Sequence, residues 1–165
     1  MGRILNPQER EQLILKNWMS HDGYWFGQIA QEWGIKAANR LNRALARRIG
    51  RTDIFRLTRA LGISKIASRE QYFELFQKAM ELYCPPHFQY DVRLAGNIQE
   101  FYITKCFAYD AVSKAGLGES YLCGVFERIG GWLDALGVGY EMDPAPGRCL
   151  MTHGQPCRRI IRLAL

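Results

Sequence analysis

The hydrophobic periodicity of this chain first changes at the proline pair Pro85 and Pro86. Before the prolines, apolar residues recur every three or four positions, as in YFELFQKAMELY, which is typical of a helix. After them, FQYDVRLAGN and IQEFYITKC alternate apolar and polar residues around a Gly-Asn turn, which indicates a β-hairpin. We therefore predict an α+β fold in one structural domain, with a helical region over residues 1–84 and an antiparallel sheet flanked by helices over residues 85–165.

The helical region contains start and stop signals for several separate helices. Pro7 predicts a first helix that ends near Ser20, and Asp22 is expected to cap a second helix that Gly34 ends. Further helices are predicted for residues 35–50, for IFRLTRALG up to Gly62, and after a cap at Ser68. Beyond the hairpin, the pattern predicts helices in FAYDAVSKAG and VFERIGGWLDALG and short strands in VGYEM, GRCLMT and CRRIIRLAL.

The composition is that of an ordinary folded protein of about one domain. A length of 165 residues falls within the usual domain size of roughly 100–200 residues. The hydrophobic share of 48% and the charged share of 23% are close to globular averages. No apolar run approaches the roughly 18 residues that span a bilayer, and the N-terminus lacks the apolar segment of a signal peptide. We therefore expect a cytoplasmic protein with no membrane partner.

The positive charge raises the question of an acidic partner. The net charge is +6, and Arg40, Arg43 and Arg47 follow a spacing that places them on one helix face. An arginine face over residues 40–59 would allow nucleic-acid binding with a steep salt dependence. The alternative, which we favour, is the solvated side of an amphipathic helix. Nucleic-acid binding is therefore ranked third, below the ligand-binding and hydrolase hypotheses given below.

The cysteines are the strongest candidates for chemistry in the second half. In a reducing compartment five cysteines do not form a disulfide framework, which leaves metal binding, catalysis or burial. Cys149 and Cys157 flank a turn and are expected on two arms of a hairpin, and Cys123 precedes a helix that returns to it. Three thiolates would form a zinc site lacking one ligand, which Cys106 or His153 would supply. Simple packing is the alternative, and an iron–sulfur cluster is less favoured because the spacing lacks a CxxCxxC run.

The segment 102–163 resembles the 4-vinyl reductase domain, a small-molecule-binding module also found in phenol-responsive bacterial transcription activators; the matching residues are Cys123, Cys149 and Cys157. The resemblance implies a structural zinc held by these cysteines and a glutamate, but Pro146 stands at the glutamate position. It also implies a fold related to TRAPP-complex subunits, an apolar ligand cavity between helices and sheet, and a homodimer. A fourth zinc ligand would come from Cys106, Glu141, Asp143 or His153.

Nearly the whole chain also resembles a group of prokaryotic proteins, some of them labelled as related to L-2-amino-thiazoline-4-carboxylate hydrolase. The matching segments are HDGYWFGQIAQEWGIKAANRLNR and CGVFERIGGWLDALG. This resemblance implies the alternative function, a hydrolase of a small cyclic C–N or C–S substrate that uses a metal-bound water or the Cys106 thiolate. Cys106 opens a predicted helix, whose dipole is expected to lower the thiol pKa. No histidine base is visibly linked to it.

Aromatic residues supply the candidate ligand pocket. We predict that Trp25, Phe26, Trp33 and Trp132 wall a pocket for a hydrophobic or aromatic ligand. The alternative is that the first three form the buried side of a helix. Gly130 and Gly131 lack the pattern of a phosphate loop and are expected to allow close helix packing beside Trp132. The leading hypothesis is a ligand-binding or sensory module braced by zinc.

Overall fold

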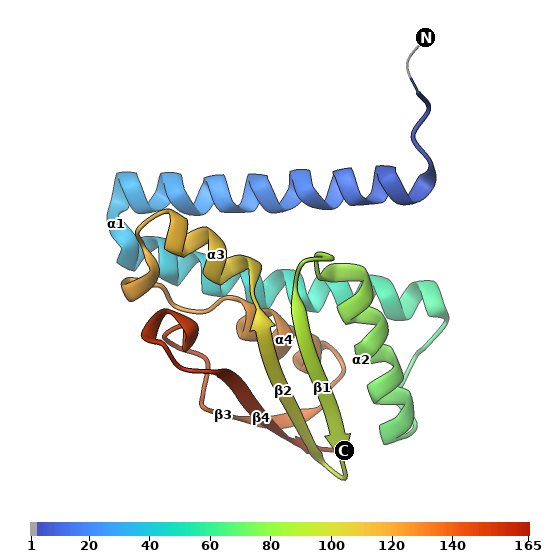
Figure 1. Cartoon of the computed structure of the whole chain (residues 1–165). Coiled ribbons are helices and arrows are strands. Elements are labelled where there is room, and N and C mark those ends of the chain that lie inside the picture. Colours follow the sequence, from blue (N-terminus) through green and yellow to red (C-terminus); the bar gives the residue numbers. More distant parts are fainter. Residues whose placement is uncertain (1–2) are drawn as a thin grey trace.

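Helices occupy the chain as far as Tyr83, and strands begin just after the proline pair, so the predicted α+β class is confirmed. The structure is a computed structural model that describes residues 3–165. Figure 1 shows its elements in chain order, which are α1 (Pro7–Leu61), α2 (Arg69–Tyr83), β1 (Gln89–Ala95), β2 (Ile98–Lys105), α3 (Phe107–Lys114), η1 (Gly118–Ser120), α4 (Val125–Ala135), β3 (Gly139–Asp143), η2 (Met151–His153) and β4 (Cys157–Ala164).

The four strands form one antiparallel sheet in the order β1-β2-β4-β3. The predicted hairpin is confirmed: Ala95 pairs with Ile98 across the Gly-Asn turn. The predicted strand in GRCLMT is wrong, because residues 149–153 form a loop and η2. Within this segment, Arg148 forms an isolated antiparallel β-bridge with Leu122.

One face of the sheet carries the core. The side chains of Phe101, Ile161 and Leu163 alternate inward and are buried, whereas Tyr102 on the opposite face is exposed. Phe101 meets Phe76 of α2 at 5.5 Å between ring centres and Phe126 of α4 at 5.6 Å. A single hydrophobic cluster therefore runs from α1 through α2 and α4 to the sheet and joins the regions on both sides of the proline pair.

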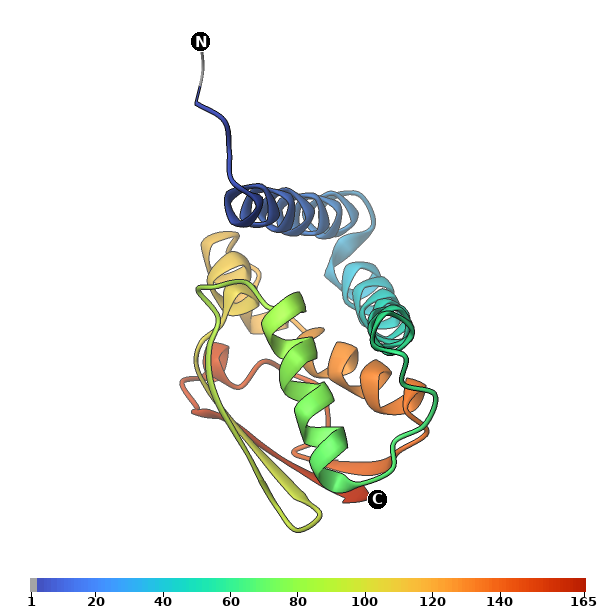
Figure 2. The same cartoon turned by 90° about the vertical axis from the view of Figure 1, so that its right-hand side faces the viewer.

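Helix α1 differs most from the prediction. The expected breaks near Ser20 and after Gly50 do not occur, and Asp22 lies within a continuous helix instead of capping one. Asn6 provides the cap, and Gly34 alone interrupts the helix, because its φ of 80° is outside the helical range. We call residues 7–33 the N-terminal arm and residues 35–61 the C-terminal arm. Figure 2 shows the N-terminal arm above α3 and the C-terminal arm beside α4.

The C-terminal arm packs directly against the backbone of α4. A Cβ atom at Gly131 would overlap the carbonyl oxygen of Arg47, and one at Gly50 would overlap that of Arg128. The predicted role of Gly131 in close helix packing is therefore confirmed. Within residues 3–165, no helix combines the length and the hydrophobicity that crossing a membrane requires.

Three arginines of the C-terminal arm form ion pairs with α4 while remaining partly exposed. Arg47 donates two hydrogen bonds to the carboxylate of Asp134, at 2.8 and 2.9 Å, and Arg51 reaches the same carboxylate at 2.7 Å. Arg43 pairs with the buried Glu127. The predicted solvated face of Arg40, Arg43 and Arg47 is therefore only partly correct: Arg40 is exposed, whereas Arg43 and Arg47 bind the adjoining helix.

Candidate ligand pocket and cysteine cluster

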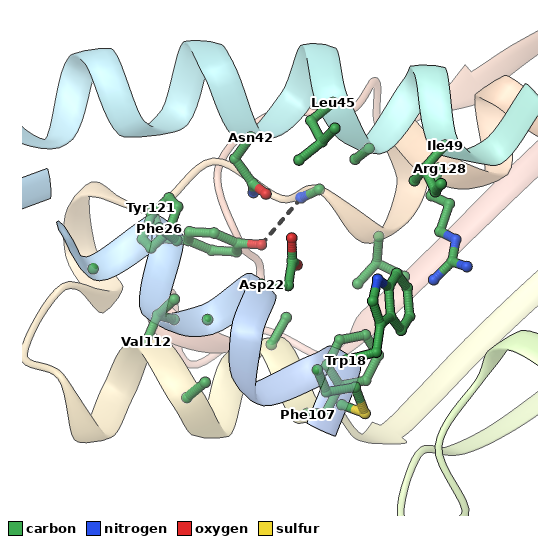
Figure 3. A pocket seen from close by; sticks show the side chains of 18 of the residues that line it. Trp18, Asp22, Phe26, Asn42, Leu45, Ile49, Phe107, Val112, Tyr121 and Arg128 are labelled. Carbon is green, nitrogen blue, oxygen red and sulfur yellow. Dashed lines mark hydrogen bonds between the residues drawn. The ribbon is translucent and has the colours of Figure 1, made fainter. Parts of the chain in front are cut away.

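A pocket of about 210 Å³ lies between the two arms of α1, the helix α3 and the first turn of α4 (Figure 3). The bend at Gly34 creates it, because the N-terminal arm returns over the C-terminal arm without burying any of its own residues in the core. The lining is mainly apolar and includes Met19, Phe26, Leu45, Ile49, Phe107, Val112, Leu117, Tyr121 and Val125.

The N-terminal arm presents one face to this pocket. Trp18, Asp22 and Phe26 follow one another at four-residue spacing, so they lie along one side of the helix. Gly23 and Gly27 lie beside them, and a Cβ atom at either position would meet nothing within 4 Å. The small residues of this helix face therefore leave the space that forms the pocket.

Arg128 closes one end of the pocket. Its Nε donates to Oδ2 of the buried Asp53 at 2.7 Å, and Nε1 of Trp132 donates to the same oxygen at 3.1 Å. The guanidinium carbon lies 4.7 Å from the ring centre of Trp18 and 5.4 Å from that of Tyr83. Arg128 thus joins the N-terminal arm to α4 through a cation–π contact, while Asp53 balances its charge.

Asp22 is the other charged side chain of the pocket lining. Its carboxylate points into the pocket in Figure 3. Within residues 3–165 it has no ion-pair or hydrogen-bond partner. Desolvation by the surrounding side chains raises its pKa, and Arg128 and His21 oppose that rise without cancelling it. Asp22 is therefore a solvent-accessible carboxylate at the edge of the pocket, with Arg128 and His21 as the nearest positive or titratable groups.

A hydroxyl and an amide complete the polar part of the pocket. The Tyr121 hydroxyl oxygen accepts a hydrogen bond from the backbone N–H of Gly124 at 3.2 Å, and burial raises the pKa of this tyrosine. The side chain of Asn42 lines the pocket above it. Together with Asp22 these groups provide hydrogen-bond acceptors at the centre of an otherwise apolar space.

The predicted pocket residues are divided among three environments. Phe26 lines the pocket and contacts Tyr121 edge to face, with 5.6 Å between ring centres. Trp132 lies in the core, outside the pocket lining. Trp25 and Trp33 are 57% and 65% exposed, so they belong neither to the pocket nor to a buried helix side.

Sequence reasoning missed Arg128 as a pocket residue and assigned Asp22 to a cap, although the aromatic residues it considered for a pocket wall include Trp18. The four-residue spacing of Trp18, Asp22 and Phe26 was the signal that could have identified this helix face. For Arg128 we find no such signal, because its role depends on Asp53, which lies 75 residues earlier in the chain.

Cys106, Cys123, Cys149 and Cys157 are all buried and come from four different segments. Cys106 precedes α3, and Cys157 begins β4 opposite Ile103. The segments of Cys123 and Cys149 run side by side, since the N–H of Cys123 donates to the carbonyl of Gly147 at 2.7 Å. The predicted hairpin between Cys149 and Cys157 is wrong, because Cys149 pairs with the chain before α4 instead.

Burial favours the protonated thiol at Cys106, Cys123 and Cys157. It raises the pKa of Cys106 and of Cys157 to about 12 and also raises that of Cys123. Neighbouring thiols add to the effect, since Cys123 and Cys149 both raise the pKa of Cys157. The prediction of a lowered pKa at Cys106 is wrong: the N–H groups at the start of α3 do lower it, but burial outweighs them.

The described residues do not hold a metal centre as they stand. Among residues 3–165, no three His, Cys, Asp or Glu side chains are arranged so that they could bind an ion. His153 lies exposed in η2. Arg159 is 1% exposed beside the cysteines, donates to the carbonyl oxygens of Pro144 and Ala145, and lowers the pKa of Cys123 and Cys157.

Comparison of the sequence with protein-family models and with curated proteins identifies no relative. No protein-family model matches this sequence, and no curated protein matches it significantly. The resemblances to the 4-vinyl reductase domain and to the thiazoline-carboxylate hydrolase group therefore stay predictions from the sequence.

Proposed function

We propose that this protein binds a small, mainly apolar molecule in the pocket between the two arms of α1. The observation that carries the proposal is an apolar space of about 210 Å³ under a helix that buries none of its own residues in the core. Concave, mainly apolar sites with a few convergent polar groups are the usual form of small-molecule sites. Asp22, Asn42, Tyr121 and Arg128 are the polar groups here.

The ligand would supply apolar contacts that the N-terminal arm lacks. The rings of Trp18 and Phe26 already meet Arg128 and Tyr121, respectively, at the two ends of the pocket. A molecule between them would bury further apolar surface of the arm. Because such a ligand binds only the folded state, it would raise the unfolding temperature, with a larger rise at higher ligand concentration or affinity.

The test fills the pocket without disturbing the fold. In Gly27→Leu the new side chain enters the empty space beside Asp22, and leucine favours the helix more than glycine does. Gln28→Leu, on an exposed position of the same turn, is the matched control. We expect the uncharged probe 2-phenylethanol to raise the unfolding temperature of the wild type and of Gln28→Leu, but not of Gly27→Leu. Equal shifts in all three proteins, or none in the wild type, would contradict the proposal.

We also propose that a structural zinc ion is held by Cys123, Cys149 and Cys157, with Cys106 as the fourth ligand. The supporting observation is Arg159, a buried cation without a carboxylate partner among residues 3–165 and with an unpaired Nε. Zinc-bound thiolates would provide the negative charge that this guanidinium lacks. Zinc binding would require the thiols to move closer together than they are here.

Metal content separates this zinc site from simple packing. We expect about one zinc ion per chain in untagged protein, loss of the metal in Cys149→Ser, and retention in Cys84→Ser, since Cys84 lies apart at the end of α2. Wild-type protein that contains no zinc, or that loses it equally in both variants, would leave the four cysteines as packing residues.

The two remaining functions receive less support. A hydrolase that uses the Cys106 thiolate would need a low thiol pKa, whereas burial raises it. Nucleic-acid binding would use the arginines of the C-terminal arm, and three of them, Arg43, Arg47 and Arg51, are already paired with carboxylates of α4. We rank both below ligand binding.

A further inference from the structure

We propose that the ligand of this pocket is an organic cation, a protonated amine with an aromatic or branched apolar body, whose ammonium group pairs with Asp22. The inference rests on the proposed function and specifies the chemistry of the ligand. It follows from the charges that line the pocket and from the groups that surround Asp22.

The uncompensated charge of the pocket is negative. Asp22 and Arg128 are the two charged side chains of its lining. The guanidinium of Arg128 is already bound by the buried carboxylate of Asp53 at 2.7 Å and lies against the Trp18 ring. Asp22 has no such partner among residues 3–165. An anionic ligand would therefore add to an existing negative charge, whereas a cation would neutralise it.

Asp22 is solvent-accessible and lies among oxygen atoms that can accept from an ammonium group. The carboxylate, the Asn42 amide and the Tyr121 hydroxyl all lie in the pocket, and each has an oxygen that can accept from an N–H donor. Desolvation raises the pKa of Asp22 by more than Arg128 and His21 lower it, and Asp22 forms no hydrogen bond or ion pair with another side chain among residues 3–165. An ammonium group would supply a charge-assisted hydrogen bond.

The aromatic rings favour the same class of ligand. Trp18 and Phe26 lie one helical turn before and after Asp22 on the same face, and Phe107 and Tyr121 face them from α3 and the segment before α4. Aromatic faces attract organic cations and also bury the apolar body that such a cation carries. The pocket thus offers one carboxylate among several rings, which suits an arylalkylamine or a branched alkylamine.

The experiment compares three probes of nearly equal size on the full-length protein. Dissociation constants of 2-phenylethylamine, 2-phenylethanol and 3-phenylpropionate are measured by calorimetry near neutral pH. The variants are Asp22→Asn, which keeps the shape of the side chain, and Glu32→Gln, which removes an exposed carboxylate from the same arm as a control. The alcohol reports on the apolar pocket, and the amine reports on the carboxylate.

We expect the wild type and Glu32→Gln to bind the amine about 10- to 100-fold more tightly than the alcohol. Asp22→Asn should lose that preference and bind the alcohol as the wild type does, which also shows that the variant is folded. An amine preference that survives in Asp22→Asn, equal binding of amine and alcohol by the wild type, or tightest binding of the carboxylate would each overturn the inference while leaving ligand binding intact. Failure of all three probes would count against the proposed function and this inference together.

Discussion

Asp22 is a charged residue on the side of the N-terminal arm that lines the pocket. It lies between Trp18 and Phe26 on the apolar face of a helix, open to the pocket and without a counterion among residues 3–165. Partial desolvation of Asp22 by the pocket lining disfavours its charged form and so lowers stability when the carboxylate is ionised. A residue that costs stability at this position is more readily explained by ligand binding than by folding.

The pH dependence of stability tests this view of Asp22. Its pKa is raised in the folded state, so the folded protein holds the proton to a higher pH than the unfolded chain does. The free energy of unfolding should therefore fall as the pH rises above about 4, the ordinary carboxyl value, through the raised pKa. We expect Asp22→Asn to be more stable than the wild type near neutral pH, with the difference shrinking in acid. Urea unfolding across this range would show it, and a variant that is less stable near neutral pH would contradict it.

At the scale of elements, the contact between the C-terminal arm and α4 holds the helical layer together. The backbones approach so closely that Gly50 and Gly131 have no room for a Cβ atom. Arginine–carboxylate pairs flank this contact, with Arg47 and Arg51 sharing Asp134. Because Gly131 and Asp134 lie one turn apart on α4, steric fit and charge pairing reinforce the same helix orientation.

Gly131→Ala should disrupt this contact. The added methyl group would overlap the Arg47 carbonyl oxygen, which belongs to the helix backbone and cannot rotate away. We expect a loss of about 1–3 kcal/mol or more in the free energy of unfolding. Gly23→Ala is the control, since its Cβ atom meets open space and alanine favours the helix by up to about 1 kcal/mol. Chemical denaturation of both variants checks the prediction, and equal effects would contradict it.

The paired carboxylate on α4 should contribute stability above acidic pH. Burial alone would raise the pKa of Asp134, but hydrogen bonds from Arg47 and Arg51 outweigh it and lower the pKa. Its contribution is therefore present above about pH 4 and lost as the pH falls through the lowered value. We expect Asp134→Asn to lose about 1–3 kcal/mol near neutral pH and little in acid.

A surface pair is the control for Asp134→Asn. Glu141 lies 4.0 Å from Arg162 on the exposed side of the sheet. Glu141→Gln should change the free energy of unfolding by less than about 1 kcal/mol. If thermal or urea denaturation found the two variants equally destabilised, the pairing of α4 with the C-terminal arm would not be a specific source of stability.

At the scale of the whole molecule, the N-terminal arm is a cover and not part of the core. The buried residues of α1 begin at Ala38, and the hydrophobic cluster runs from Ile54 to Leu163. The arm touches the rest of the protein through a few contacts, such as Trp18 with Arg128 and Phe26 with Tyr121. Stability and ligand binding are therefore expected to reside in different parts of the chain.

Deletion of residues 1–33 should separate these properties. We expect residues 34–165 to fold with a loss of about 1–3 kcal/mol, since one cation–π contact and one aromatic pair are removed with some apolar burial. The shortened protein should no longer bind 2-phenylethanol, because one wall of the pocket is gone. Near-ultraviolet circular dichroism and calorimetry would test both points; loss of cooperative unfolding would show that the arm belongs to the folding unit.

Local sequence signals were sufficient for the elements that short-range physics determines. Ser68 caps α2 as predicted, Gly34 and Gly62 end helical segments, and the Gly-Asn turn closes the hairpin. Each of these depends on backbone conformations and hydrogen bonds within a few residues. The α+β class followed because periodicity reports directly which residues share a face.

The tertiary structure alone decided which faces meet. Asp53 balances Arg128 from 75 residues away, and this contact makes Asp22 the unpaired charge of the pocket. Likewise, Cys149 lies beside the segment of Cys123 because a bridge joins residues 122 and 148, which no local pattern indicates. Periodicity along the chain determines the faces of helices and strands, but pairing between distant faces depends on packing that only the folded chain defines.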